Sequence, residues 1–315
     1  MTHQKIALVT GVAGFIGSAL ADKLISLGYE VKGLDNFSTG KRENLQDLLK
    51  LSAFTLIEGD IRDFEICQKS VKGVEVVFHQ AALGSVPRSV KDPLTTHDNN
   101  VTGFLNMLLS ARDANVKRFV YASSSSVYGD SVRLPKVEGE EGRVLSPYAF
   151  SKKSNEEYAR LFFNLYGFPT VGLRYFNVFG PRQDEKGAYA AVIPLFIKAA
   201  LAEEAPFING DGTQSRDFTF IDNVVDANIK AALSESKAWG RAFNVGCGER
   251  VNLLELYSEI RKIVGSGKDP IHREVREGDV KDSLADLERT KKFLGYNPFV
   301  NWREGLQKTV DWYRN

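Results

Sequence analysis

A tyrosine and a lysine four positions apart are the residues of this sequence best placed to move a proton. Tyr148 and Lys152 lie in the segment SPYAFSKKSNEEYARLFF, which predicts a helix with Ser146 as its N-cap and Pro147 in its first turn. On a helix the two side chains share one face. A neighbouring ammonium lowers the pKa of a phenol from its usual ~10, so Tyr148 could accept a proton. The alternative is an ordinary solvent-facing aromatic and cation.

Four serines precede this helix, at the end of the apolar segment RFVYASSSSVYG. Ser124 lies inside this run, and Ser123, Ser125 and Ser126 flank it. Strand ends meet at one edge of a parallel sheet, where ligands bind. We therefore expect the serine hydroxyls to lie beside the tyrosine.

Three evenly spaced glycines follow the apolar segment KIALVT. Gly11, Gly14 and Gly17 open the predicted helix SALADKLISLG. Bare backbone at a helix N-terminus can approach a pyrophosphate, because its N–H groups and dipole favour anions. The alternative is a tight packing turn.

An aspartate ends the next strand and predicts which dinucleotide is bound. Asp35 follows the glycine loop and its helix in the chain, at a place where a carboxylate accepts hydrogen bonds from ribose and repels a 2′-phosphate. This favours NAD over NADP, although Lys41 and Arg42 could hold a 2′-phosphate. Asp60 follows the third strand and is either an adenine contact or a turn residue.

An oxidised nicotinamide, held by these residues, would add to the lowering of the Tyr148 pKa.

The elements that position these residues alternate strand and helix. Apolar strands without polar alternation predict a parallel sheet buried on both faces, namely KIALVT, YEVKGLD, FTLIEGD, VEVVFHQA, RFVYASS and TVGLRYF. The fold class expected is α/β, a doubly wound parallel-sheet Rossmann domain with a smaller, interleaved α/β C-terminal domain, because FTFIDNVVDANIKAAL and RAFNVG return to the first pattern. The predicted limits are 1–175 plus about 218–247 for the NAD-binding domain, and about 176–217 plus 248–315 for the substrate domain.

Composition excludes several classes of protein. Lys and Arg total 41 against 40 acids and are scattered, so neither nucleic acid nor a membrane is an expected partner. No segment reaches the ~20 apolar residues of a spanning helix. Two cysteines, without a CxxC or His/Cys cluster, predict no metal and a cytoplasmic location.

At this point the sequence resembles the extended short-chain dehydrogenases, and among them the bacterial UDP-N-acetylglucosamine 4-epimerases. The stretches that carry the resemblance are HQAALGSVPRSVKDP, GLRYFNVFGPRQDEKGAYAAVIPLFI, INGDGTQSRDFTFIDN and EGDVKDSLAD. The resemblance implies Ser124, Tyr148 and Lys152 as catalytic residues. It implies NAD contacts at Gly11, Gly14, Phe15, Ile16, Gly17, Asp35, Asn36, Ser38, Thr39, Gly40, Asp60, Ile61, Gln80, Ala81, Ala82, Asn99, Tyr148, Lys152, Tyr175, Asn177 and Val178.

The resemblance also implies a UDP-sugar site. Its residues would be Gly84, Ser85, Ser124, Ser125, Ser126, Tyr148, Asn177, Gln183, Ala191, Val192, Phe207, Asn209, Arg216, Arg276, Asp279 and Ser283. The two arginines suit diphosphate oxygens. The alternatives are a surface ion pair for Arg216, core filling for Phe207, and a helix N-cap for Ser283. His79 is expected to be a packed, hydrogen-bonded residue.

The expected reaction is reversible inversion at C4 of a UDP-hexose through a 4-keto sugar, with hydride held transiently as NADH. The small Ser283 favours UDP-N-acetylglucosamine and its galacto epimer, for polysaccharide biosynthesis. Alternatives are a UDP-glucose or, less favoured, a UDP-uronate 4-epimerase. The serine run lacks the acid of related dehydratases and decarboxylases, and a dinucleotide sensor would not need Tyr148 and Lys152. The helices holding Tyr148 and TGFLNMLLSARDA are expected to form a homodimer interface, although core packing explains their apolar surface equally well.

Overall fold

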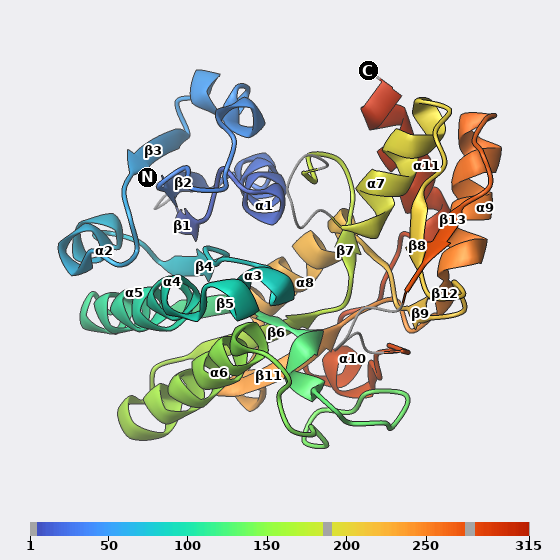
Figure 1. Cartoon of the computed structure of the whole chain (residues 1–315). Helices are drawn as coiled ribbons and strands as arrows, with labels where there is room; N and C mark the ends of the chain where they lie inside the picture. The colour runs from blue at the N-terminus through green and yellow to red at the C-terminus, as the bar shows by residue number, and fades with distance from the viewer. Residues whose placement is uncertain (1–4, 185–190, 275–280, 315) are drawn as a thin grey trace.

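A parallel seven-stranded sheet forms the centre of the larger part of the chain (Figure 1). In this computed structural model the described residues are 5–184, 191–274 and 281–314. The strand order is β11-β6-β5-β4-β1-β2-β3, and every neighbouring pair is parallel. The strands are β1 (Ile6–Thr10), β2 (Glu30–Asp35), β3 (Phe54–Glu58), β4 (Val76–His79), β5 (Arg118–Ser124), β6 (Thr170–Tyr175) and β11 (Arg241–Val245).

The strands lack polar alternation because both faces of the sheet are covered. On β1, Ala7 and Val9 belong to one apolar cluster and Leu8 belongs to the other. Helices α1 (Phe15–Ser26) and α8 (Ile221–Leu233) supply side chains to the first cluster. The predicted doubly wound α/β architecture is therefore confirmed.

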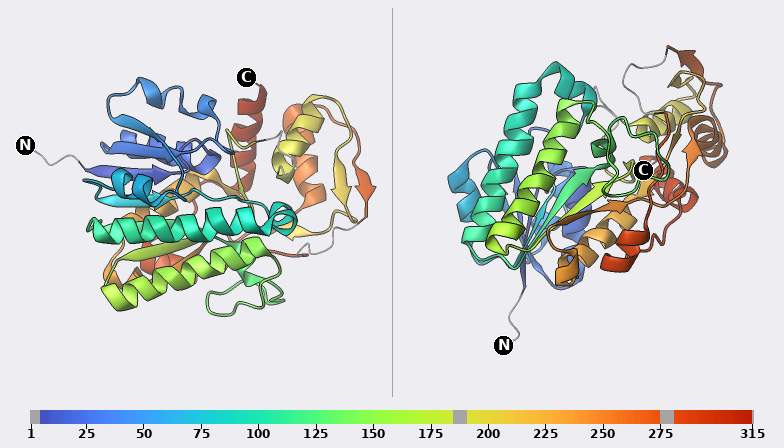
Figure 2. Two further views of the ribbon diagram at one scale, coloured as in Figure 1. Left: turned by 60° about the vertical axis from the view of Figure 1, so that its left-hand side comes forward. Right: turned by 90° about the horizontal axis from the view of Figure 1, so that it is seen from below.

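The opposite face carries a second set of helices, which Figure 2 shows side by side along the sheet. They are α2 (Phe64–Ser70), α5 (Gly103–Asp113) and α6 (Pro147–Tyr166), whose side chains fill the second cluster. The short helices α3 (Val86–Lys91) and α4 (Pro93–His97) precede a π-helical turn at Asp98–Thr102.

The remaining elements form a smaller part beside the carboxyl ends of the strands (Figure 1). Three short pairs occur there: β7 with β10, β8 with β13, and β9 with β12. Helices α7, α9 and α11 pack together, and α10 lies against β11 and α8. The bounds are β7 (Val178–Phe179), α7 (Val192–Leu201), β8 (Phe207–Asn209), β9 (Ser215–Arg216), β10 (Thr219–Phe220), β12 (Val251–Asn252), α9 (Leu253–Val264), β13 (Ile271–Arg273), α10 (Glu288–Leu294) and α11 (Trp302–Arg314).

The chain enters this smaller part twice. It leaves the sheet after β6, returns to it through α8 and β11, and leaves again. This is the interleaving that the return of the strand and helix pattern predicted. The exact domain limits stay a prediction.

Helix starts show where local signals suffice and where they do not. Ser146 caps α6 by accepting a hydrogen bond from the Ala149 N–H at 3.1 Å, and Pro147 opens the helix, as predicted. The N-cap alternative for Ser283 is wrong, because α10 begins at Glu288 after Leu287.

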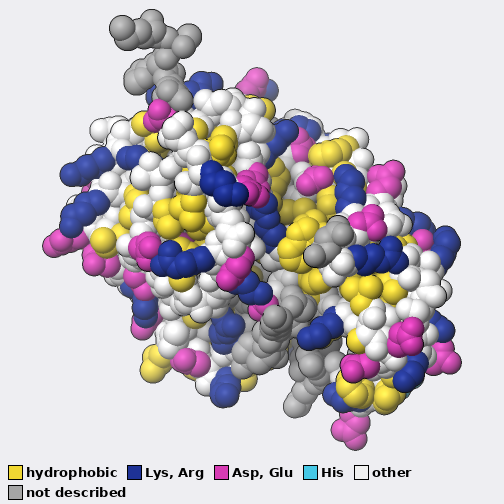
Figure 3. Space-filling model, turned by 90° about the horizontal axis from the view of Figure 1, so that it is seen from above, with side chains coloured by type: hydrophobic (Ala, Val, Ile, Leu, Met, Phe, Trp, Pro, Cys, Tyr) yellow, Lys and Arg dark blue, Asp and Glu magenta, His cyan; other side chains and the backbone are white. Residues whose placement is uncertain are grey.

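Charged side chains of both signs lie on the surface. On the face drawn in Figure 3, basic and acidic side chains are interspersed. Within the described ranges, no helix combines the length and apolarity needed to cross a bilayer.

Candidate active site

The glycine loop between β1 and α1 is shaped by close backbone contacts. Gly11 has φ +68°, and a Cβ placed on it would lie 2.8 Å from the Cα of Ala81. A Cβ on Gly17 would lie 2.1 Å from the carbonyl oxygen of Gly11. Gly14 is the N-cap of α1 and has no side chain to satisfy the first N–H groups. The loop therefore presents backbone donors at a helix N-terminus, as anion sites do.

A pocket opens beside this loop, lined by residues from the ends of several strands. Twelve of its fifteen lining residues were predicted as NAD contacts, namely Gly11, Gly14, Asp35, Asn36, Ser38, Thr39, Gly40, Ile61, Gln80, Ala81, Ala82 and Asn99. The sequence prediction missed Leu34, Gly59 and Leu83, although each lies next to or near a strand end. The predicted contacts Phe15, Ile16, Gly17, Asp60, Tyr148, Lys152, Tyr175, Asn177 and Val178 lie outside this lining.

Asp35 is buried at the end of β2 and holds the glycine loop through backbone hydrogen bonds. Its two carboxylate oxygens accept hydrogen bonds from the N–H groups of Ala13 and Phe37, each at 2.8 Å. Burial raises the pKa of Asp35, and these backbone bonds oppose the rise. Each oxygen keeps a lone pair that could accept a ribose hydroxyl.

The two cations considered for a 2′-phosphate both have acidic partners. Lys41 forms an ion pair with Asp184 at 2.6 Å, and Arg42 pairs with Glu58 at 2.6 Å. The Arg42 guanidinium also lies 4.1 Å from the ring centroid of Phe37. These contacts make both side chains less suited to a phosphate than the sequence alone allowed.

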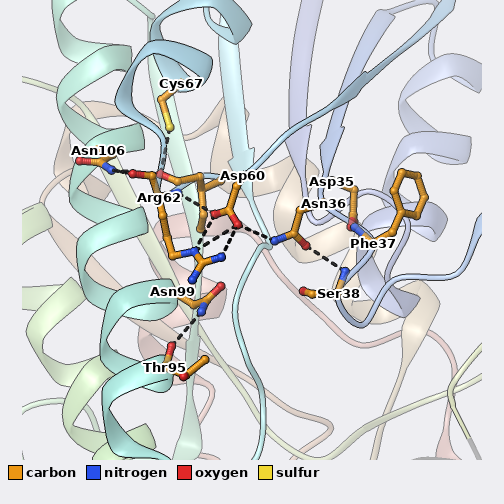
Figure 4. A network of polar contacts seen from close by, with 11 residues as sticks. Asp35, Asn36, Phe37, Ser38, Asp60, Arg62, Cys67, Thr95, Asn99 and Asn106 are labelled. Carbon is orange, nitrogen blue, oxygen red and sulfur yellow. Dashed lines mark hydrogen bonds and ion pairs between the residues drawn. The ribbon is translucent and has the colours of Figure 1, made fainter.

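A polar network joins the turns that follow β2 and β3 (Figure 4). Asn36 Nδ2 donates to Asp60 Oδ2 at 2.8 Å, and Asn36 Oδ1 accepts from the Ser38 N–H at 3.0 Å. Arg62 donates to Asp60 from Nη2 at 2.7 Å, which lowers the pKa of that carboxyl to about 2. Asp60 is thus a turn residue outside the pocket lining, which contacts the lining residue Asn36 and has its carboxylate held by Arg62.

Tyr148 and Lys152 lie where α6 meets the end of β5. The Ser124 side chain lies close enough to the Tyr148 hydroxyl to act on its pKa. The Lys152 Nζ lies 5.9 Å from the Tyr148 ring centroid and donates to the Ala122 carbonyl at 2.8 Å. Tyrosine, lysine and serine are therefore brought together as the sequence predicted.

The electrostatics of this pair differ from the prediction. Burial raises the pKa of Tyr148, with the Ser124 side chain acting in the opposite direction. Burial also lowers the pKa of Lys152 to about 8, against the effect of Glu156. Removing both groups from water therefore outweighs the lowering of the Tyr148 pKa that was expected from Lys152.

Two buried clusters support the floor of the site. His79 is bonded to the Thr10 hydroxyl at 3.0 Å, and burial lowers its pKa to about 3, which confirms a packed, neutral role. Tyr175 donates to Gln80 Oε1 at 3.1 Å and accepts from Asn228 Nδ2 at 2.9 Å. Tyr175 therefore fixes a pocket residue through its hydroxyl.

The serines and their neighbours divide into capping and open groups. Ser124 Oγ accepts from the Ser126 N–H at 3.1 Å, and Ser85 Oγ accepts from the Arg88 N–H at 3.1 Å. Ser126 Oγ is buried without a hydrogen-bond partner among the described residues. A buried hydroxyl without a partner beside Ser124 could bind a polar ligand group. Ser125 opens the same 3₁₀ turn, and a Cβ on Gly84 would meet no atom within 4 Å.

The turn after β6 is strained and tied to the smaller part. Asn177 has φ +23°, which is uncommon for a residue other than glycine, and its Nδ2 donates to the Asp217 carbonyl at 3.2 Å. Gln183 Nε2 donates to the carbonyl of Val178 at 2.9 Å. Strain of this kind is concentrated at ligand sites.

Other predicted substrate residues come from β8, β9 and α7. Phe207 is half exposed, so core filling is wrong, and the guanidinium of Arg273 covers its ring at 3.1 Å. Asn209 accepts a bond from Gln214 through its carbonyl at 2.6 Å. Ala191 precedes α7 as its N-cap and Val192 is the first helical residue.

Arg216, Asp217 and Ser283 link three segments of the smaller part. Arg216 Nη1 donates to the carbonyls of Ser215 and Lys281, both at 2.9 Å. Ser283 is buried, and its N–H donates to the Ser215 carbonyl at 3.1 Å. The predicted contacts Arg276 and Asp279 lie outside the described residues.

Asp217 was not singled out from the sequence, yet it is fully buried. Its carboxylate accepts from the N–H groups of Cys247, Gly248 and Ala285 at 2.8, 2.9 and 3.1 Å. Burial raises its pKa to about 6. An aspartate beside an arginine suggested an ion pair, whereas this carboxylate joins separate backbone segments.

Several known proteins match this chain over nearly its whole length and share its fold. Residues 7–246 match the family described as the NAD dependent epimerase/dehydratase family. A UDP-glucose 4-epimerase of Mycolicibacterium smegmatis is 39% identical over 310 residues, covering 98% of both chains. The structure of a UDP-N-acetylglucosamine 4-epimerase from Methanobrevibacter ruminantium, in complex with UDP-N-acetylmuramic acid, is 40% identical, with TM-score 0.94 and 99% of both chains covered. That of a Bacillus cereus UDP-glucuronic acid 4-epimerase with UDP-glucuronic acid and NAD is 32% identical, with TM-score 0.91 and 98% and 99% covered.

Proposed function

The chain belongs to the NAD-dependent epimerase/dehydratase family, and we propose that it inverts C4 of UDP-N-acetylglucosamine to give UDP-N-acetylgalactosamine. NAD is its cofactor, and the broader activity is that of a UDP-sugar 4-epimerase. The observation that carries the proposal is that Tyr148, the Ser124 side chain and the Lys152 ammonium lie together where α6 meets the end of β5. These groups could remove a proton from one hydroxyl and return it.

The pocket supports NAD through its shape and its donors. Glycine backbone at the N-terminus of α1 would hold the pyrophosphate, and Asp35 would accept a hydrogen bond from the adenosine ribose. Lys152 would hold the nicotinamide ribose. Bound NAD supplies reversible hydride acceptance from C4 of the sugar.

The side chains at the end of β5 would carry the proton steps. Tyr148 takes the proton of the C4 hydroxyl as that carbon loses hydride. Ser124, which lies next to Tyr148, would donate a hydrogen bond to the C4 oxygen. Lys152 stabilises the phenolate during the step. The 4-keto sugar then turns about its diphosphate, receives hydride on the other face, and regains the proton from Tyr148.

Replacing Tyr148 by Phe tests this assignment. We expect epimerisation to fall by at least about 10²-fold, the usual contribution of a general base, while UDP-sugar binding is retained. NMR of the sugar product measures turnover, and calorimetry with UDP-N-acetylglucosamine measures binding. Wild-type turnover in Tyr148→Phe would contradict the mechanism.

The preference for an acetylated sugar is supported by the small Ser283. By resemblance, related epimerases restricted to unacetylated hexoses have a bulky residue at this position. We expect Ser283→Tyr to lower the ratio of UDP-N-acetylglucosamine to UDP-glucose turnover, and Ser283→Ala, its matched control, to leave the ratio unchanged. The same ratio in all three proteins would refute the gate.

A UDP-glucose 4-epimerase is the second candidate, favoured by the 39% identical relative of that name. A UDP-uronate 4-epimerase is the third, with a relative of lower identity. Parallel kcat/KM measurements on the acetylated, unacetylated and uronate UDP-sugars distinguish the three. Highest kcat/KM for UDP-glucose or UDP-glucuronate would replace the proposed preference.

A homodimer joined through α5 and α6 is part of the same proposal. Phe150, Leu161 and Leu165 of α6 are exposed, and Leu105 and Leu109 of α5 are only partly buried. Sizing chromatography with light scattering tests this, and a monomer at micromolar concentration would contradict it.

The two free cysteines suit a protein that acts in a reducing compartment, for which we propose the cytoplasm.

A further inference from the structure

One stripe of α6 clamps three consecutive residues at the end of β5. Tyr148, Lys152 and Glu156 are spaced by four and share one helix face. Tyr148 lies close to the Ser124 side chain, and Lys152 Nζ donates to the Ala122 carbonyl at 2.8 Å. Ser123 Oγ donates to Glu156 Oε1 at 2.6 Å. The reactive pair therefore continues into a third charged residue one turn further along α6.

Glu156 is buried and held by a second charged side chain. Arg174 on β6 donates to Glu156 from Nε at 2.9 Å and from Nη2 at 2.8 Å. Arg174 Nη1 also lies 2.5 Å from an oxygen of Glu141, in the loop before α6. The Glu156 and Arg174 side chains are only 7% and 5% exposed.

Buried ion pairs need a reason beyond stability, because apolar side chains of similar volume often stabilise a fold equally well. Here the bidentate contact with Arg174 fixes the plane of the Glu156 carboxylate, so the oxygen that meets Ser123 is held in one place. The end of β5, where Ser124 lies, is held with it.

Glu156 also bears on the charge of Lys152. Burial lowers the pKa of Lys152 to about 8, and the carboxylate of Glu156 raises it. His79 of β4 faces Lys152 but is neutral, since its pKa is lowered to about 3. Among the described residues, the other ionisable groups near this cluster are Tyr121 of β5, Tyr128 of the turn after β5, Arg174 of β6, Glu138 and Glu141 of the loop before α6, and Tyr148, Lys153 and Glu157 of α6.

We propose that Glu156 is a positioning residue: its carboxylate, fixed by Arg174, holds Ser123, and with it Ser124, in register with Tyr148, and places a negative charge one helical turn from Lys152. This role rests on the proposed function for its effect on turnover, but not for its effect on Lys152. Glu156 acts through its neighbours and does not contact the sugar.

The first test reads Lys152 directly and needs no turnover. Trace acetylation of the purified full-length protein across a pH series, followed by mass spectrometry, gives the pH at which Lys152 becomes reactive. We expect Glu156→Gln to lower this midpoint by about one pH unit, because a nearby opposite charge is lost. Glu156→Asp keeps the charge and should stay near wild type. An unchanged midpoint in Glu156→Gln overturns the inference, whether or not the protein turns over a UDP-sugar.

The matched control is Glu157→Gln, the same change one residue later. The Glu157 side chain is about half exposed and is paired with Arg160 on the helix surface. It should leave the Lys152 midpoint and the pH profile of turnover unchanged. An equal shift in both variants would mean that any loss of charge on α6 has the effect, which would also overturn the assignment.

The second test separates positioning from charge. Ser123→Ala removes only the bond from β5 to Glu156, and we expect kcat to fall on the order of tenfold with KM within about twofold. Glu156→Gln should in addition move the alkaline fall of kcat to lower pH. If Glu156→Gln does not fold, Ser123→Ala and the Glu156→Asp midpoint decide: wild-type kcat in Ser123→Ala, or a midpoint lowered in Glu156→Asp, refutes the role.

Discussion

Gly14 and Gly17 belong to one loop, but the structure predicts opposite consequences for the same substitution. Gly17→Ala should destabilise the fold, because its Cβ would lie 2.1 Å from the Gly11 carbonyl oxygen. Gly14→Ala should leave the fold nearly intact, because its Cβ would lie 3.1 Å from that oxygen and otherwise meets open space. Gly14 lines the pocket and Gly17 does not. Gly14→Ala should therefore weaken NAD binding, with little effect on the stability of the fold.

The magnitudes follow from the shifts that each methyl group requires. Ordinary contact begins near 3.4 Å, so the backbone must move by more than an ångström for Gly17→Ala but by only a few tenths of an ångström for Gly14→Ala. Overpacking costs about 1–3 kcal/mol, and loss of the Gly14 N–H bond to the Gly11 carbonyl adds about 1 kcal/mol. We expect a loss of about 2–4 kcal/mol for Gly17→Ala and of less than about 1 kcal/mol for Gly14→Ala, whose backbone at φ −78° and ψ 172° accepts alanine.

Urea unfolding of nucleotide-free protein measures the stability of each variant, and calorimetric titration with NAD measures affinity. Gly14→Ala should bind NAD at least about tenfold more weakly, since a methyl group would stand where a phosphate approaches the helix N-terminus. Equal stabilities for the two variants would refute the packing argument. Wild-type NAD affinity in Gly14→Ala would refute the placement of the pyrophosphate.

Two carboxylates give further predictions. For Asp217, the folded pKa of about 6 exceeds the ordinary 3.8, so its contribution to stability is complete only well below pH 3.8 and is lost as pH rises through 6. Relative to Asp217→Asn, wild-type stability should fall by about 2 kcal/mol between pH 4 and pH 7. A constant difference in urea unfolding across this range would contradict the sign. Asp35→Asn leaves one of the N–H groups of Ala13 and Phe37 facing an amide donor, so it should cost about 1–3 kcal/mol and reduce the NAD that copurifies, measured by absorbance after release. Full NAD content together with wild-type stability would count against the role of Asp35.

Local patterns were sufficient where the physical cause is local. Continuous apolar runs predicted the first six strands of the sheet, and Ser146 with Pro147 predicted the start of α6. The rule that a serine before a helical pattern is its N-cap failed at Ser283. Its backbone N–H is bonded to the distant Ser215, and the helix begins later, at Glu288.

Features made by residues far apart in the chain could not be predicted from the sequence. The buried carboxylate of Asp217 depends on three N–H groups from two other segments, and Glu156 depends on Arg174 from a neighbouring strand. The raised pKa of Tyr148 depends on burial, which spacing alone does not reveal. The site roles themselves, apart from NAD as cofactor, stay predictions.

The late arrival of β11 has a consequence for synthesis of the protein. Strand β6 is buried along its whole length, and its outer partner β11 is translated only after the intervening segment from β7 to α8. Until Arg241–Val245 leaves the ribosome, the growing chain has a β6 with unpaired N–H and C=O groups along one side. A nascent or truncated chain ending before Arg241 is therefore expected to recruit strands from other molecules and to require chaperones that the finished protein does not.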